Sequence, residues 1–246
     1  MALKPTVVLL VALAATPVTA RAQDAGPGFL FGAPLGSFTV RGGWALPRAQ
    51  SDFFAFTTEN LTLNRGDFSS PAIDGDFAVR VSPRTDVILS SGWSGMKRRS
   101  EFRHFIDNND QPIEQTTTFR RVPITIGVKQ YLTSTGRSIG KFAWIPSRFA
   151  PFVGAGGGTM FYSFRQDGDF IDFKTNDVFP SYYASSGWTG TAYGAAGVDY
   201  SLGPRFALTS EARYTWSSAE LSRDFSGFGR LDLSGLSTTV GLAVRF

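Results

Sequence analysis

The chain has 246 residues, a formal net charge of +4, 18% charged residues and 14% aromatic residues. This length suits a single domain, and the small positive charge gives no reason to expect a nucleic acid partner. The sequence has no cysteine and one histidine, which excludes a disulfide framework and disfavours a transition-metal site.

The first 22 residues have the order of a secretory signal. Lys4 precedes an apolar run from Val7 to Ala15, and small residues end the segment at Ala20 and Ala22. The run is shorter than the ~20 apolar residues that a membrane-spanning helix needs. We therefore expect residues 1–22 to be a cleaved signal peptide. The rest of the sequence holds no stretch of 18 or more apolar residues, so we expect no membrane-spanning helix.

Eight later segments alternate between apolar and small or polar residues, as strands do. In the clearest of them, Val122, Ile124 and Ile126 alternate with Thr125 and Gly127. Each segment is about long enough to cross a membrane as a tilted strand. In chain order, the segments are 38–45, 77–81, 87–94, 122–129, 150–163, 187–200, 206–216 and 237–246.

The connections between these segments alternate between short and long. Residues 82–85 and 202–205 are tight turns that contain proline. The long connections are polar, and we expect them to be loops at residues 46–72, 96–116, 164–186 and 220–230. Short periplasmic turns and long extracellular loops alternate in this way in outer-membrane barrels.

One connection, residues 133–149, breaks this alternation because it is long where a short periplasmic turn is expected. It is either a solvated hairpin extension with an aromatic side chain at the membrane boundary, or a periplasmic contact or lipid-facing shelf.

The last segment ends on an aromatic residue, and its apolar face consists of Val240, Leu242, Val244 and Phe246. A soluble sandwich also alternates, but there the apolar face is the interior. The signal, the terminal Phe246 and the aromatic residues near segment ends favour the membrane alternative. We predict an all-β, eight-stranded, antiparallel up-and-down transmembrane β-barrel in the bacterial outer membrane. It would occupy residues 37–246, after a periplasmic N-terminal segment at residues 23–36.

With these features, the chain resembles the small outer-membrane β-barrel family of the OmpA transmembrane domain, OmpX and OmpW. The resemblance is carried by the signal, the final strand and residues 122–128, 151–156, 197–200 and 211–214. It implies that the barrel-insertion machinery reads Val240, Leu242, Val244 and Phe246, and that periplasmic chaperones assist assembly. Such barrels include adhesins, narrow channels and lipid-modifying enzymes.

Seven charged residues lie on the face of their strands opposite the apolar face, so we expect their side chains to point into the lumen. Because an eight-stranded barrel is just wide enough for side chains to fill it, we expect these charges to pair with one another. Basic residues outnumber acidic ones, so water or acids from less clearly assigned strands must supply the remaining partners. The alternative is an anion-selective channel. The residues are Arg41, Arg80, Lys129, Asp199, Glu211, Arg213 and Arg245.

A basic cluster follows the third segment, where lipopolysaccharide phosphates would lie, and it is either a contact for them or a solvated loop base. It consists of Lys97, Arg98, Arg99 and Arg103. His104 lies beside it, but no nucleophile motif accompanies this histidine, so we expect no enzyme, no cofactor and no metal.

We therefore expect a monomer with a structural or cell-surface interaction role through its extracellular loops, in contact with outer-membrane lipid and lipopolysaccharide. The alternative is a narrow passive channel or an OmpW-like pathway for small or hydrophobic solutes. A lipid-A-modifying enzyme is a third and weaker alternative.

Overall fold

The computed structural model describes residues 29–107, 110–140 and 143–246, so the predicted signal peptide lies outside the described residues. Within them, eight long strands form the main body. They are β1 (Gly36–Pro47), β2 (Ser70–Ser82), β3 (Thr85–Ile106), β4 (Pro112–Tyr131), β7 (Phe149–Ile171), β8 (Val178–Ser201), β9 (Phe206–Ala219) and β11 (Gly235–Arg245). The short elements are α1 (Asp52–Asn60), η1 (Arg65–Phe68), β5 (Gly136–Ile139), β6 (Ala143–Pro146), η2 (Arg223–Phe225) and β10 (Leu231–Asp232).

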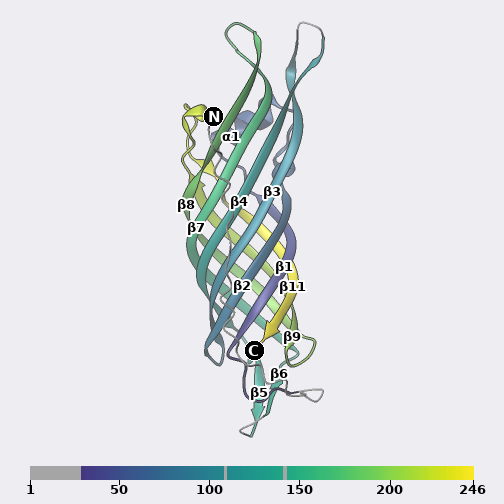
Figure 1. Cartoon of the computed structure of the whole chain (residues 1–246), viewed down its shortest axis with the longest axis vertical. Helices are drawn as coiled ribbons and strands as arrows, with labels where there is room; N and C mark the ends of the chain where they lie inside the picture. The colour runs from purple at the N-terminus through teal and green to yellow at the C-terminus, as the bar shows by residue number, and fades with distance from the viewer. Residues whose placement is uncertain (1–28, 108–109, 141–142) are drawn as a thin grey trace, which may run out of the picture.

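The eight long strands close into a ring (Figure 1). Each pairs antiparallel with the next one along the chain, and the last strand, β11, pairs with the first, β1. This closing seam runs from the pair of Ser37 with Arg245 to the pair of Pro47 with Gly235. The predicted eight-stranded up-and-down antiparallel barrel is confirmed.

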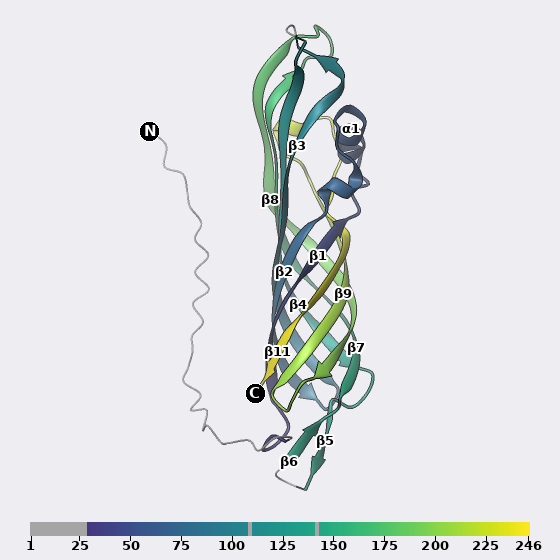
Figure 2. The same ribbon diagram turned by 90° about the vertical axis from the view of Figure 1, so that its right-hand side faces the viewer.

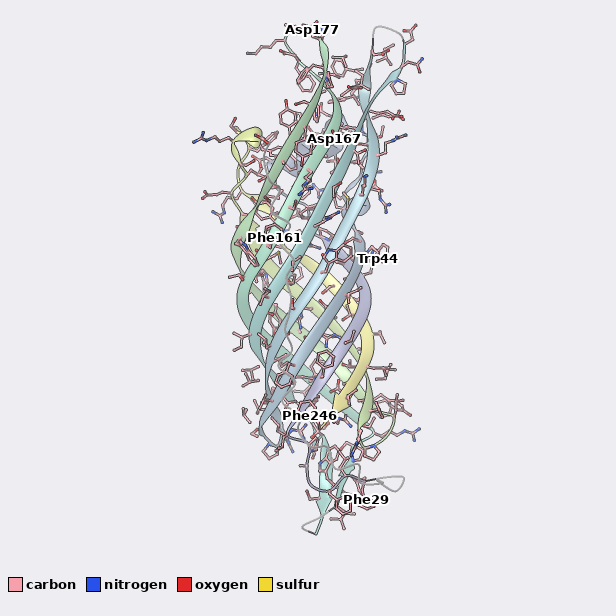
Figure 3. All side chains as sticks on the ribbon, in the orientation of Figure 1. Phe29, Trp44, Phe161, Asp167, Asp177 and Phe246 are labelled. Carbon is pink, nitrogen blue, oxygen red and sulfur yellow. The ribbon has the colours of Figure 1, made fainter. Side chains whose placement is uncertain are left out.

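The outer face of the ring is apolar and the inner face is polar. Phe77, Leu89 and Ile126 are exposed on the outside, whereas Asp76 and Thr125, their neighbours in sequence, are buried inside. A water-soluble barrel has the reverse arrangement, so the apolar belt faces lipid and the barrel spans a membrane. Large aromatic side chains mark the upper part of this belt, where Figure 3 shows Trp44 and Phe161 at similar heights.

Among the described residues, no helix is long and apolar enough to cross a membrane.

Glycines on the inner face make room for large lumen side chains. A Cβ atom at Gly127 would meet the hydroxyl of Tyr193, and one at Gly197 would meet the ring of Phe152. In the glycine-rich part of β7, a Cβ atom at Gly156 would likewise meet the ring of Tyr193, so this glycine also serves side-chain packing in the lumen.

Two of the predicted long loops are largely strands. β3 and β4 pair as far as Glu101 and Glu114 and, after an irregularity, again at Ile106 and Pro112. β7 and β8 pair as far as Ile171 and Val178. These two hairpins rise beyond the belt at the end of the barrel that we call the loop end (Figure 1). We call them the arms (residues 95–121 and 162–187). The polar outer face of the arms concealed them, because no apolar alternation marks a strand outside the membrane.

An aromatic cap fills the space between the arms and the barrel. Helix α1, in the predicted loop 46–72, brings Phe53 within 4.8 Å of the ring centroid of Phe164, and Phe54 lies 4.8 Å from Phe68. Phe225 of η2 joins them, 5.2 Å from Phe53. Figure 2 shows α1 at the loop end, close to the arms. The connection 46–72, which we expected to be a polar loop, is therefore a packed helical cap. Its phenylalanines are buried, but they do not follow the alternation of a strand, so the sequence did not predict their burial.

The opposite end, the turn end, carries an additional small hairpin. β5 and β6 pair with each other, and Leu30 extends them through two backbone hydrogen bonds with Trp144, of 2.9 and 2.8 Å. Trp144 is only 3% exposed, so it is not an aromatic side chain at the membrane boundary. The described residues of the connection 133–149 thus include a hairpin that contacts Leu30 below the barrel (Figure 2).

Candidate functional sites in the lumen and on the arms

A cluster of two arginines and two carboxylates occupies the centre of the lumen. Nη1 of Arg41 donates to Oδ2 of Asp76 at 2.5 Å, and Nη2 of Arg41 lies 3.5 Å from Oε1 of Glu211. Nε of Arg213 donates to the same Glu211 oxygen at 2.8 Å. All four side chains are buried, and they come from β1, β2 and β9. The cluster is electrically neutral and joins three strands across the lumen, and we call it the central cluster.

A second polar group lies nearer the turn end. Nζ of Lys129 donates to Asp199 at 3.0 Å, and the hydroxyl of Tyr131 donates to the same carboxylate at 2.8 Å. The Lys129 ammonium also lies 3.7 Å from the ring centroid of Phe152. Arg245 lies below this group, where its Nη1 donates to the hydroxyl of Ser201 at 2.9 Å.

All seven charged residues predicted to face the lumen lie on the inner face of the barrel. Arg41, Glu211 and Arg213 meet in the central cluster, and Lys129 meets Asp199. Arg80 pairs instead with a residue that sequence reasoning missed, Asp86, at 3.4 Å.

Three further lumen acids were missed or left unassigned. Asp74 and Asp76 lie on β2 before the first clearly alternating residue, Phe77. Asp86 is the second residue of β3, directly after the turn between β2 and β3. The period of two, extended backwards from Phe77, would have placed Asp74 and Asp76 inside. Asp76 pairs with Arg41 and Arg213, and Asp86 pairs with Arg80, so these two acids supply part of the partners that the basic excess required. Arg245 has no ion pair with a described residue and donates instead to the hydroxyl of Ser201.

A small cavity of about 50 Å³ separates the central cluster from the aromatic cap. Its lining includes Asp74, Arg121, Thr125, Tyr193 and Arg213. The hydroxyl groups of Thr125 and Tyr193 are buried and have no hydrogen-bond partner among the described residues. A polar cavity of this volume holds a few water molecules, which would satisfy both hydroxyl groups.

The structure divides the predicted basic cluster between different surroundings. Lys97 and Arg99 lie on the outer face of the arm, and Arg99 is 3.5 Å from Glu114. Arg98 belongs to the opposite face, because it pairs with the fully buried Thr117. Nη2 of Arg103 donates to the carbonyl oxygen of Leu63 at 3.3 Å, which ties this arginine to the cap.

No catalytic arrangement is found around His104 in the described part of the chain. His104 is exposed near the tip of β3, whereas Ser100 is buried and its hydroxyl donates to the carbonyl oxygen of Gln115 at 3.5 Å. The described residues also contain no cluster of three or more histidine, cysteine, aspartate or glutamate residues that could hold a metal ion.

No protein-family model matches the chain, and no curated protein does. Solved structures similar to it include the attachment invasion locus protein Ail of Yersinia pestis, with 13% identity and a TM-score of 0.45 over 86% of this chain and 99% of that one. Neisserial surface protein A has 13% identity and a TM-score of 0.44 over 86% and 99% of the two chains. Escherichia coli outer membrane protein W has 17% identity and a TM-score of 0.37 over 87% and 100%. These proteins are small outer-membrane β-barrels, and the fold of this chain is defined by its own strand pairings.

Proposed function

We propose that this protein is a bacterial outer-membrane β-barrel that serves a structural or cell-surface interaction role through its arms. In this proposal the turn end is periplasmic and the loop end is extracellular. One observation carries it: side chains fill the lumen, while β3, β4, β7 and β8 continue well beyond the lipid-facing belt. A barrel built in this way holds a rigid surface outside the cell.

The packing of the lumen supports a non-conducting barrel. Arg41 in the central cluster is 2% exposed, and Phe54 and Phe164 in the cap are fully buried. Moving a single buried charge out of its pairing leaves its partners uncompensated, which costs about 3–5 kcal/mol. Steady opening of the lumen would therefore need several unfavourable changes at once.

The alternative, a narrow channel or a pathway for small or hydrophobic solutes, is tested by conductance. The full-length protein, reconstituted in a planar bilayer, should give no stable single-channel steps. A variant that lacks residues 50–67 serves as the reference for a barrel whose cap is missing. Reproducible ion-selective steps from the unaltered protein would overturn the filled-lumen proposal.

The surface role is tested with arm variants. Replacement of the exposed side chains at the arm tips with serine should abolish attachment of bacteria to whichever surface or partner the unaltered protein supports. Matching changes in the turn 202–205 should leave attachment unchanged. Both variants must keep the heat-dependent gel mobility of a folded barrel. Equal attachment by cells with and without the protein, across a panel of surfaces, would contradict the proposal.

A lipid-modifying activity is examined in the same strains. Mass spectrometry of extracted lipid A should give the same acyl pattern with and without the protein, because the serine and histidine of the arm are not brought together. A changed pattern would replace the interaction role with an enzymatic one.

A further inference from the structure

We propose that the outer face of the arms binds the phosphate groups of an outer-leaflet glycolipid through Lys97, Arg120 and Arg165. We call these three residues the phosphate patch. The inference deepens the proposed function and rests on it only in requiring that the barrel lies in the outer membrane.

The strand register brings the three residues together from β3, β4 and β7. Thr118 on β4 pairs with Lys97 on one side and with Arg165 on the other. Neighbouring strands are ~4.8 Å apart, so the backbones of Lys97 and Arg165 are about 10 Å apart. Arg120 lies two residues along β4 on the same face, diagonal to both at roughly 7–8 Å. Three such long side chains can reach the oxygens of one phosphate group.

The three charges have no ionic partner among the residues that the structure describes. All three side chains are exposed, and none has a hydrogen bond or ion pair with another described residue. The neighbouring Arg99, by contrast, pairs with Glu114. Like charges on adjacent strands repel one another, so this arrangement is destabilising until an anion neutralises it. Guanidinium groups bind phosphate oxygens in a bidentate manner, which adds to the Coulomb attraction.

A glycine holds the arginine at the centre of the patch close to the membrane belt. A Cβ atom at Gly95 would lie 3.1 Å from Cγ of Arg120 and 3.0 Å from Cζ2 of Trp93. The missing side chain therefore gives space for the Arg120 stem to lie over the strand, next to the indole ring. The stem of Arg120 therefore begins two residues before Val122, at the upper border of the apolar belt.

The position of the patch favours a lipid over a soluble anion. Directly below it, Val122 pairs with Phe161 and Phe161 pairs with Trp188, which forms an apolar row on the outer face. Acyl chains can pack along this surface while the phosphate lies at the patch. Figure 3 shows Asp167 on the same strand well above Phe161, and Arg165 lies between them in the sequence. Acidic residues higher on the arm, such as Asp167 and Glu114, would repel a long polyanion that extended along the arm, so they disfavour such a ligand.

The experiment measures binding of lipid A to the refolded full-length protein in detergent micelles by native mass spectrometry. The probes are bisphosphorylated lipid A, its dephosphorylated form, inorganic phosphate and heparin. The test variant is K97Q/R120Q/R165Q, and the matched control is R223Q, an exposed arginine of η2 at the same end. A second variant, G95V, keeps every charge and crowds the stem of Arg120 together with the neighbouring ring of Trp93.

We expect the unaltered protein and R223Q to retain bisphosphorylated lipid A. The triple variant should lose affinity roughly tenfold or more, because each charge-assisted hydrogen bond to phosphate is among the strong ones. G95V should weaken binding to a smaller extent, and dephosphorylated lipid A should not distinguish the unaltered protein from the triple variant.

Equal binding by the triple variant, or equal binding of dephosphorylated lipid A, would overturn the inference. Displacement of lipid A by equimolar phosphate or heparin would replace the lipid with a soluble anion and would overturn it as well. Heat-dependent gel mobility is checked for every variant, and R120Q alone is used if the triple variant does not fold. A protein that does not fractionate with the outer membrane contradicts the proposed function, whereas a lipid-binding failure in a correctly located barrel contradicts only this inference.

Discussion

Arg41 on β1 and Asp76 on β2 are joined in the lumen by a hydrogen-bonded ion pair of 2.5 Å, and Arg41 also reaches Glu211 on β9. The first strand is therefore linked through its interior side chain to a neighbour on one side and to a strand two positions away on the other. Backbone pairing alone would connect β1 only to β2 and β11.

Substitution of Arg41 with methionine should lower the free energy of unfolding by about 3–5 kcal/mol, because Asp76 and Glu211 would remain buried with less compensation. Urea titration of the protein in lipid vesicles gives this value. The control is Arg84→Met in the exposed turn between β2 and β3, which should leave the transition midpoint unchanged. Equal midpoints for the two variants would show that the central cluster does not stabilise the barrel.

Substitution of Phe53 with alanine should loosen the cap without unfolding the barrel. The ring is 1% exposed and contacts Phe164 and Phe225, so its loss costs about 3–5 kcal/mol. Hydrogen exchange should become faster in residues 53–60 and stay unchanged in β9. Phe56→Ala is the matched control, since that ring is 38% exposed. Uniform acceleration across all strands would contradict a separable cap.

Alanine at Gly127 should destabilise the barrel by about 1–3 kcal/mol, because its Cβ would meet the Tyr193 hydroxyl and the carbonyl oxygen of Ala155. Alanine at Gly190 should be neutral, since no atom lies within 4 Å of the added Cβ. The fraction that refolds in detergent, followed on gels without heating, compares the two. A tolerated Gly127→Ala would mean that the Tyr193 ring can move within the lumen.

Alanine at Phe246 should reduce assembly in cells several-fold. Phe246 stacks on Phe77 at 5.9 Å, and its carbonyl oxygen accepts backbone hydrogen bonds from Leu35 and Gly36. If the insertion machinery reads this residue, assembly in cells should fall further than refolding in detergent does. Phe149→Ala, an exposed aromatic residue at the same end, serves as the control. An equal decrease in both assays would indicate a purely structural role.

The alternation of the last strand predicted which residues face lipid and which face the lumen, because the lipid-facing positions of a membrane strand must be apolar. Outside the membrane this constraint ends. Lys97 and Arg120 are as acceptable on a solvated strand as in a loop, so the length of the arms could not be predicted. Their inner face becomes apolar at Met96 and Phe119, but the partner that covers these residues, α1, is far away in the sequence.

Prediction of the lumen was limited by strand boundaries. Asp76 pairs with Arg41 only because β2 begins at Ser70, several residues before the alternation becomes visible. The phosphate patch depends on register across three strands, since Thr118 must lie between Lys97 and Arg165. No single segment of the sequence contains that information.

The closing seam between β1 and β11 has a consequence for assembly. It joins the two ends of the barrel, so the pairs that seal it have the greatest separation along the chain and form only after the last strand has been synthesised. Until then, the sheet has two open edges whose backbone groups can pair with another chain. A chain of this topology must therefore keep both edges from pairing with other chains until the ring closes, and the seam is the place where an incomplete barrel stays open.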